Sequence, residues 1–188
     1  MLAWLKQRRD RRRTARFLYG SIVTQARSEG FYASWGVPDT AEGRFEMIVL
    51  HMSLVLDRLS SEGELGRKLG QALTEAFVVD VDDGLREMTV GDLAVPRQVK
   101  RAVATLRERY GIWRTALAAP GDGLLREALA GRLATLGGGE HLNIGPLCAY
   151  IREASRALGM LPRAEVLAGR VGWPTLRPLR EGARAPSG

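Results

Sequence analysis

The chain has 188 residues, of which 45% are hydrophobic and 26% charged, the balance of a globular rather than a disordered protein. This length allows one domain whose hydrophobic core needs no metal or disulfide. The longest apolar stretch, Met47–Leu56, is about half of the ~20 residues that a membrane-spanning helix requires. We therefore expect no membrane span, and the single Cys148 favours a reducing, cytoplasmic compartment.

The net charge of +7 is concentrated at the amino terminus. In the first sixteen residues Asp10 alone opposes seven cations, so this segment carries about +6 of the total. We interpret residues 1–16 as a basic arm suited to contact with anionic lipid or ribosomal RNA. The residues expected to make this contact are Lys6, Arg8, Arg9, Arg11, Arg12 and Arg13.

Helical spacing recurs along the chain, and no alternating β-strand pattern is evident. The first helix is expected from Arg8 to Glu29, ended by Gly30. Helices are then expected at residues 44–59 and 64–79, followed by a short helical turn at 83–88. The side chains that the first helix should bury are Phe17, Ile22, Val23 and Ala26.

The helix after Pro96 has the clearest pattern, because proline suits a first helical turn and apolar residues recur at steps of three and four over residues 97–118. Further helices are expected at residues 123–136 and 144–158, with a short one after residue 161 and a loose tail from residue 180. The apolar stripe of the helix after Pro96 contains Val99, Val103, Leu106, Tyr110, Trp113 and Leu117.

These elements predict an all-α protein: a single compact domain of six to eight helices that is not a simple four-helix bundle. The predicted organisation is a basic N-terminal arm (1–16), a helical domain (17–175) and a flexible tail (176–188).

The residues that could support catalysis or metal binding are sparse. His51 and His141 are the only histidines, and neither lies in a His-Glu-x-x-His pattern. The acidic residues of 80–83, followed by Gly84, resemble a calcium loop with its glycine one place early, and helix capping is the favoured interpretation. The triple glycine at 137–139 is interpreted as a linker. We expect no enzyme, no cofactor and no metal site.

Polar residues of the helix at 44–59 fall on two stripes. One stripe contains Glu46, Ser53 and Asp57 and is expected to face water. The second contains Arg44, His51 and Arg58, with apolar residues on both sides. Two interpretations remain open: the arginines extend past the core while His51 bonds to a backbone carbonyl, or the stripe is a contact patch. A contact patch predicts that reversing both arginine charges would leave stability nearly unchanged.

The helix after Pro96 is basic away from its apolar stripe. Either this face is solvated, or it contacts phosphate or an acidic partner. The cations are Arg97, Lys100, Arg101, Arg107, Arg109 and Arg114, opposed by Glu108.

Three ordered segments resemble the ubiquinol–cytochrome c chaperone family. They are YGSIVTQAR (19–27) continuing into FYASWGVPDT (31–40), GRFEMIVLHMSLVLDRL (43–59) and VVDVDDGLREMTVGDLAVPRQVKR (78–101). The resemblance covers roughly residues 17–120, departs from the family pattern at Val81 and Thr89, and does not extend by eye beyond Ala119.

The resemblance implies a helical chaperone, without a catalytic centre, that binds newly made cytochrome b. It also implies a small partner subunit and a location on the cytoplasmic side, peripheral on the inner membrane, with no specific DNA binding. The candidate client or partner surface comprises Arg44, His51, Arg58, Asp82, Arg86, Glu87, Asp92, Pro96, Arg97 and Lys100. The alternatives are a basic helical nucleic-acid-binding module and a lipid-surface protein without a client.

Overall fold

The computed structural model describes residues 2–87, 94–136 and 142–176. Within these ranges the chain forms seven α-helices and no β-strand, so the predicted all-α class is confirmed. A π-helical turn, η1 (Gly30–Ser34), follows α1, and a 3₁₀ turn, η2 (Ala134–Leu136), follows α5. The helices are α1 (Leu2–Ala26), α2 (Ala41–Ser60), α3 (Gly63–Glu87), α4 (Val95–Ala118), α5 (Gly123–Leu133), α6 (Ile144–Met160) and α7 (Arg163–Leu167).

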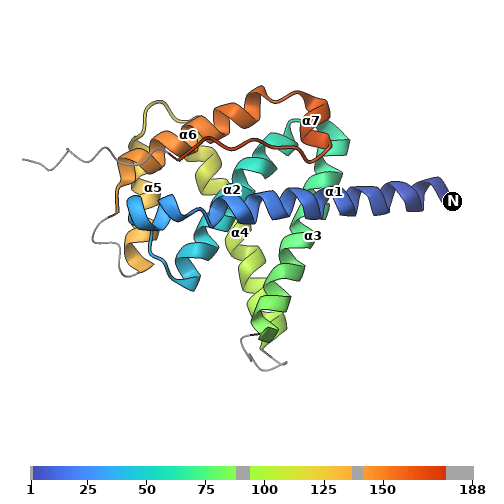
Figure 1. The fold of residues 1–188 in the computed structure, drawn as a ribbon, viewed down its shortest axis with the longest axis horizontal. Helices are drawn as coiled ribbons and strands as arrows, with labels where there is room; N and C mark the ends of the chain where they lie inside the picture. Colours follow the sequence, from blue (N-terminus) through green and yellow to red (C-terminus); the bar gives the residue numbers. More distant parts are fainter. Residues whose placement is uncertain (1, 88–93, 137–141, 177–188) are drawn as a thin grey trace, which may run out of the picture.

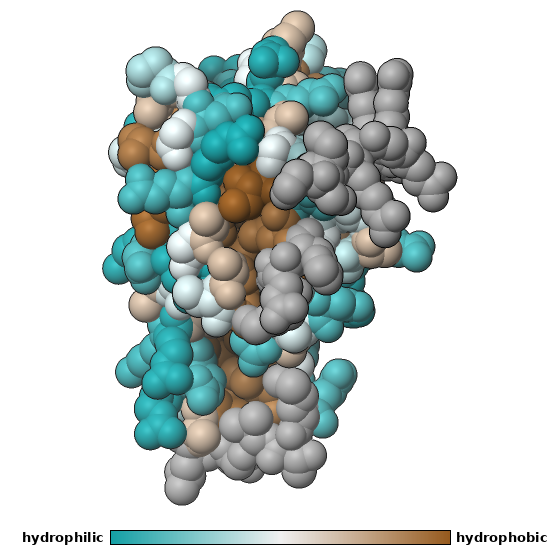
Figure 2. Space-filling view, turned by 90° about the vertical axis from the view of Figure 1, so that its left-hand side faces the viewer, coloured by the Kyte–Doolittle hydropathy of each residue, from teal (hydrophilic) through white to brown (hydrophobic). Residues whose placement is uncertain are grey.

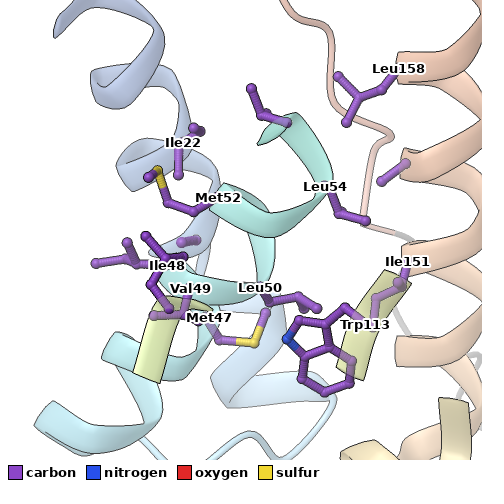
Figure 3. Packing of buried hydrophobic residues seen from close by; sticks show 14 of the residues in the cluster. Ile22, Met47, Ile48, Val49, Leu50, Met52, Leu54, Trp113, Ile151 and Leu158 are labelled. Carbon is purple, nitrogen blue, oxygen red and sulfur yellow. The ribbon is translucent and has the colours of Figure 1, made fainter. Parts of the chain in front are cut away.

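Helix α2 lies at the centre of the molecule. Thr40 caps its first turn, where the side-chain oxygen accepts a hydrogen bond from the Gly43 amide at 3.0 Å. Every residue from Glu46 to Val55 is buried. The apolar side chains of α2 point in several directions, toward α1, α4 and α6 (Figure 3). A helix that is apolar all round is stable only inside a core, which is where α2 lies.

The remaining helices surround α2. Helix α1 packs against α3 and α2, and α4 packs against α2, α3 and α5. In Figure 1, α1 crosses in front of α2 and α3, and its N-terminal end extends beyond the other helices. Helix α6 packs against α2 and α5, which completes the enclosure of the central helix.

After α7 the chain returns along α1, as the dark red segment in Figure 1. We call residues 168–176 the C-terminal strap. Gly169 starts it with a φ of 76°, and its backbone approaches Thr14 so closely that a Cβ atom there would lie 2.8 Å from the threonine methyl carbon. Farther along, the Trp173 indole Nε1 donates a hydrogen bond to Ser21 Oγ at 3.1 Å. The strap therefore links the C-terminal part of the chain to the first helix.

Two predicted helix boundaries were wrong. Helix α1 begins at Leu2 instead of Arg8, so the basic arm is helical and continuous with the domain. Helix α3 runs unbroken to Glu87, where two separate elements were expected. The acidic residues that suggested a break lie inside this helix, and the Asp82–Arg86 pair, one turn apart at 2.7 Å, supports its last turns.

The predicted inward faces were largely correct. Ile22 and Ala26 are buried on α1, and Leu106 and Trp113 are buried on α4, where Pro96 occupies the first turn. Phe17 is the exception, because its side chain is 66% exposed. The predictions for the glycines at 137–139 and for the tail from residue 180 lie outside the described residues.

Candidate functional site

Two interpretations of His51 were open, a hydrogen bond to a backbone carbonyl or a place in a contact patch, and the structure puts this residue in the core. It is fully buried, with its ring centroid 5.6 Å from that of Phe31 and 5.0 Å from that of Trp173. Its Nδ1 lies 2.7 Å from the Met47 carbonyl oxygen, and its Nε2 lies 2.8 Å from the Tyr150 hydroxyl. The interpretation in which His51 bonds to a backbone carbonyl is therefore confirmed, and its burial excludes the contact surface.

Arg58 is likewise structural. Its side chain is 12% exposed and forms an ion pair with Glu62. Its Nε donates to the Leu158 carbonyl oxygen at 2.8 Å, and its Nη2 donates to the Leu161 carbonyl oxygen at 2.9 Å. These carbonyls belong to the last turn of α6 and to the residue after it, where the regular hydrogen bonds of the helix end. Arg58 therefore joins α2 to the end of α6, which excludes it from a free contact patch.

The stripe expected to face water is also largely buried. Glu46 is 2% exposed and accepts a hydrogen bond from Arg132 Nε at 2.5 Å. Arg109 Nε lies 3.4 Å from the second carboxylate oxygen of Glu46. Ser53 is buried as well and donates to the Val49 carbonyl oxygen at 2.7 Å. The Glu46 cluster connects α2, α4 and α5, and it removes Arg109 from the predicted basic face of α4.

Arg44 is the one member of its stripe that stays accessible. Its side chain is 51% exposed, and its Nε lies 2.7 Å from Asp39. The guanidinium lies 5.7 Å from the centre of the Tyr32 ring. The hydrogen bond that Arg44 Nε donates to Asp39 lowers the pKa of the Asp39 carboxyl group. Arg44 thus remains available to a partner, although it is separated from the other surface candidates by the fold.

The structure brings six other candidates together where α3 ends and α4 begins. We call Asp82, Arg86, Glu87, Pro96, Arg97 and Lys100 the tip surface. Except for Asp82, which is half-buried and paired with Arg86, these residues are exposed. In Figure 1 the two helix ends project below the rest of the molecule. Asp92, the seventh candidate of this region, lies outside the described residues.

Apolar side chains accompany the charges of the tip surface. Leu85 on α3 and Val99 and Val103 on α4 are half-buried and lie outside the main hydrophobic cluster. Val95 is fully buried but also separate from that cluster. The projecting ends of α3 and α4 therefore combine charged groups with partly exposed apolar surface.

The acidic residues at 80–83 neither cap a short helix nor form a loop, because they lie within α3. Asp80 accepts a hydrogen bond from the Tyr19 hydroxyl at 2.8 Å, and burial, reinforced by this carboxylate, raises the pKa of that tyrosine. Across the described ranges, His, Cys, Asp and Glu side chains form no cluster of three that could hold a metal ion.

A groove between α4 and α5 was not predicted. It has a volume of about 850 Å³. Its lining includes two partly exposed apolar residues, Ile112 and Leu124, and two glycines, Gly111 and Gly131. Figure 2, which shows the side of the molecule on the left of Figure 1, has apolar surface along its middle, flanked by hydrophilic residues.

The basic arm is accessible along most of its length. Lys6, Arg8, Arg9, Arg12 and Arg13 are exposed, and Arg11 is half-buried. Two large apolar residues beside them are also exposed, Trp4 by 58% and Leu5 by 50%. The Arg8 guanidinium lies 5.7 Å from the centre of the Trp4 ring. No helix in the described part of the chain is both long enough and apolar enough to cross a membrane.

The fold and these surfaces define an all-α protein whose accessible features are suited to binding. A family model for the ubiquinol-cytochrome C chaperone matches residues 33–173. The crystal structure of the Cbp3 homolog from Brucella abortus superposes with a TM-score of 0.79 and 31% identity, covering 94% of this chain and 98% of that one. The chain belongs to the ubiquinol–cytochrome c chaperone family.

A curated relative is similar over most of this chain. The ubiquinol-cytochrome c reductase complex assembly factor 1 of Drosophila melanogaster is 26% identical in an alignment over 171 residues, which covers 85% of this chain. The chain spans 64% of the length of that relative. The family match confirms the predicted resemblance and extends it past Ala119 to residue 173, a region where no similarity was recognised from the sequence.

Proposed function

We propose that this protein is an assembly chaperone for ubiquinol–cytochrome c reductase that binds newly made cytochrome b and acts without catalysis. The observation that carries the proposal is the family match over residues 33–173. The similarity to the Drosophila assembly factor and to the Brucella structure supports it. A small partner subunit and a peripheral position on the inner membrane belong to the same proposal.

The tip surface is the proposed contact for the client or the partner subunit. Arg97 and Lys100 are exposed at the start of α4, beside the half-buried Val99 and Val103. A client that is largely apolar, with charged loops, would need both kinds of surface in one place. Arg44 is a second accessible candidate, whereas the burial of His51 and Arg58 removes them from this role.

The proposal is tested by purification of the tagged full-length protein from membranes solubilised in mild detergent. We expect cytochrome b to be recovered with the wild-type protein. We expect Arg97→Glu combined with Lys100→Glu to reduce this recovery about tenfold or more, because charge reversal at a contact replaces attraction by repulsion. Deletion of the protein should lower the level of assembled ubiquinol–cytochrome c reductase.

The matched control is Arg107→Glu combined with Arg156→Glu, which makes the same change in net charge at exposed positions of α4 and α6. This variant should recover cytochrome b as the wild type does. Recovery of no respiratory-complex component, together with normal cytochrome b after deletion, would refute the chaperone proposal. Equal losses in both double variants would refute the tip surface as the contact.

A further inference from the structure

The outward side of α1 combines cations with an unburied aromatic ring. We call Lys6, Arg9, Arg13, Phe17, Gly20 and Thr24 the outer stripe. These residues follow one another in steps of three or four, which places them on one side of the helix, and all of them are exposed. Phenylalanine is among the residues most often buried in folded proteins, yet Phe17 is 66% exposed.

The position of Phe17 is fixed by the opposite side of the helix. Ala15, Leu18, Ile22 and Ala26 are all fully buried there. Turning α1 to bury Phe17 would bring these four side chains into water, which would cost more apolar burial than it gained. The exposed ring is therefore a consequence of the way α1 packs, and it is held in place by a rigid helix.

The charges of the arm are mostly uncompensated. Within the described residues, Arg12 is the one cation between Lys6 and Arg16 that has a carboxylate within ion-pair distance, and Glu75 lies 3.9 Å from it. Both of those side chains are about half exposed, so this pair neutralises little. An exposed row of free cations creates a positive potential that attracts an anionic surface.

Exposed apolar groups also occur farther toward the N-terminus, on other sides of α1 than the outer stripe. Trp4 and Leu5 lie on the part of α1 that passes beyond the other helices (Figure 1). The thirteen residues from Trp4 to Phe17 span roughly 20 Å of a straight helix. Cations interspersed with aromatic and aliphatic side chains along a straight helix are typical of an interfacial membrane helix. Contact with phosphate alone would account for the cations but not for these apolar groups.

We propose that α1 is an interfacial helix that binds the surface of an anionic phospholipid bilayer through the outer stripe. Phe17 enters the boundary between headgroups and acyl chains, and Lys6, Arg9 and Arg13 contact lipid phosphates. The inference deepens the proposed function, on which it rests for its biological setting, by naming the surface at which the chaperone works. The binding itself needs no client.

The test is flotation of the purified full-length protein with vesicles. We expect binding to phosphatidylcholine vesicles that contain phosphatidylglycerol and little binding to pure phosphatidylcholine. Phe17→Ala should weaken binding about tenfold, because it removes a ring that becomes buried in lipid. Arg9→Gln with Arg13→Gln should weaken binding roughly 25-fold, or about fivefold for each lost cation.

Two matched controls separate the outer stripe from general effects. Met160→Ala removes another side chain that is 77% exposed, and Arg107→Gln with Arg156→Gln removes two exposed cations from α4 and α6. Both should bind vesicles as the wild type does. In a second measurement, Phe17→Trp should show stronger fluorescence quenching by brominated phospholipid than the wild type.

The lipid assignment is overturned if the outer-stripe variants float as well as the wild type, or if neutral vesicles bind equally. It is also overturned if the protein binds RNA through the outer stripe and ignores vesicles. Loss of vesicle binding in the outer-stripe variants while cytochrome b is still recovered from detergent would support the lipid surface as a separate site. A failed vesicle test would therefore leave the proposed binding of cytochrome b intact. Failure to recover cytochrome b would likewise leave the proposed lipid surface intact.

Discussion

The hydrogen bonds of His51 define its protonation state. The Met47 carbonyl oxygen can only accept, so Nδ1 carries the proton and Nε2 accepts from the Tyr150 hydroxyl. The Tyr150 oxygen in turn accepts from Gln25 Nε2 at 3.0 Å. Burial lowers the pKa of His51 to about 4, despite the opposing effect of the Met47 carbonyl. The imidazole is therefore neutral in the folded protein at neutral pH.

This burial predicts a loss of stability in mild acid. The unfolded chain binds a proton at His51 below about pH 6.5, whereas the folded protein binds one only near pH 4. Unfolding is therefore favoured progressively as the pH falls from about 6.5 to about 4, by roughly 3 kcal/mol in all. Thermal unfolding measured across this range should show a steep decrease in Tm.

The variant that checks this prediction is His51→Gln, which cannot titrate there. Its Tm should be lower at neutral pH but should depend less on pH than that of the wild type. Parallel Tm curves for the wild type and His51→Gln would contradict a buried neutral His51.

Arg58 and Arg44 should respond differently to charge reversal. Arg58→Glu would place a second carboxylate beside Glu62 and remove the hydrogen bonds that Arg58 donates to the carbonyls of Leu158 and Leu161. A loss of about 3–5 kcal/mol in the free energy of unfolding is expected, as for a broken buried ion pair. Arg44→Glu breaks an exposed pair with Asp39 and a contact with the Tyr32 ring, so its unfolding midpoint should stay close to that of the wild type.

Urea denaturation of the two single variants measures this difference. A lower midpoint for Arg58→Glu would contradict the expectation, drawn from the sequence, that reversing the charges of Arg44 and Arg58 leaves stability nearly unchanged. Equal midpoints for Arg58→Glu and Arg44→Glu would show that the contacts of Arg58 with the end of α6 contribute little.

At the scale of elements, the C-terminal strap closes the side of the core that α1 and α2 leave open. Trp173 reaches Ser21 on α1 through its indole nitrogen, and its ring faces His51 of α2 at 5.0 Å. Both partners are far from Trp173 in the sequence. The strap therefore stabilises the packing of the first helices from the other end of the chain.

Replacement of Trp173 should loosen this packing. Trp173 is partly buried, so Trp173→Ala is expected to lower the free energy of unfolding by about 2–4 kcal/mol, somewhat below the value for a fully buried tryptophan. Trp4→Ala is the matched control, because its ring is 58% exposed, and it should change stability by less than about 0.5 kcal/mol. Chemical denaturation followed by circular dichroism compares the two variants. A Trp173→Ala midpoint equal to that of the wild type would contradict a stabilising role for the strap.

Elements were predicted most reliably where one face of a helix is buried and the other is wet. Helix α4 has this character, and its Leu106 and Trp113 are buried as its spacing predicts. Helix α3 was divided in two because acidic residues and Gly84 resemble a helix boundary. The Tyr19–Asp80 hydrogen bond and the Asp82–Arg86 pair form only in the folded helix, so the sequence pattern does not reveal them.

At the scale of the whole molecule, the enclosure of α2 explains why its polar residues were assigned incorrectly. Stripes on a helical wheel indicate exposure only when one side of the helix faces water. Helix α2 has neighbours on every side, so Glu46 meets arginines of α4 and α5, and Arg58 meets the end of α6. Glu46, His51 and Arg58 each have a partner that is distant in the sequence, whereas Ser53 bonds within the helix to the Val49 carbonyl oxygen.

The family match shows how recognition from sequence depends on local patterns. The segments that carried the resemblance lie between Tyr19 and Arg101, yet the match begins at residue 33 and continues to 173. Helix α6 and the strap contribute buried packing without a short recognisable motif. The whole of α1 precedes the matched range, so the proposed role of its outer stripe in lipid binding rests on the residues of this chain.

The sequence by itself determined the helical class, the concentration of positive charge before residue 17 and the inward face of α4. These properties depend on composition and on residues within a few helical turns of one another. The tertiary structure alone decided which charges are buried, that Phe17 is exposed and that candidate residues of α3 and α4 form one tip surface. Those outcomes depend on which helices enclose α2 and on where the C-terminal strap returns, and both are set by packing between segments far apart in the chain.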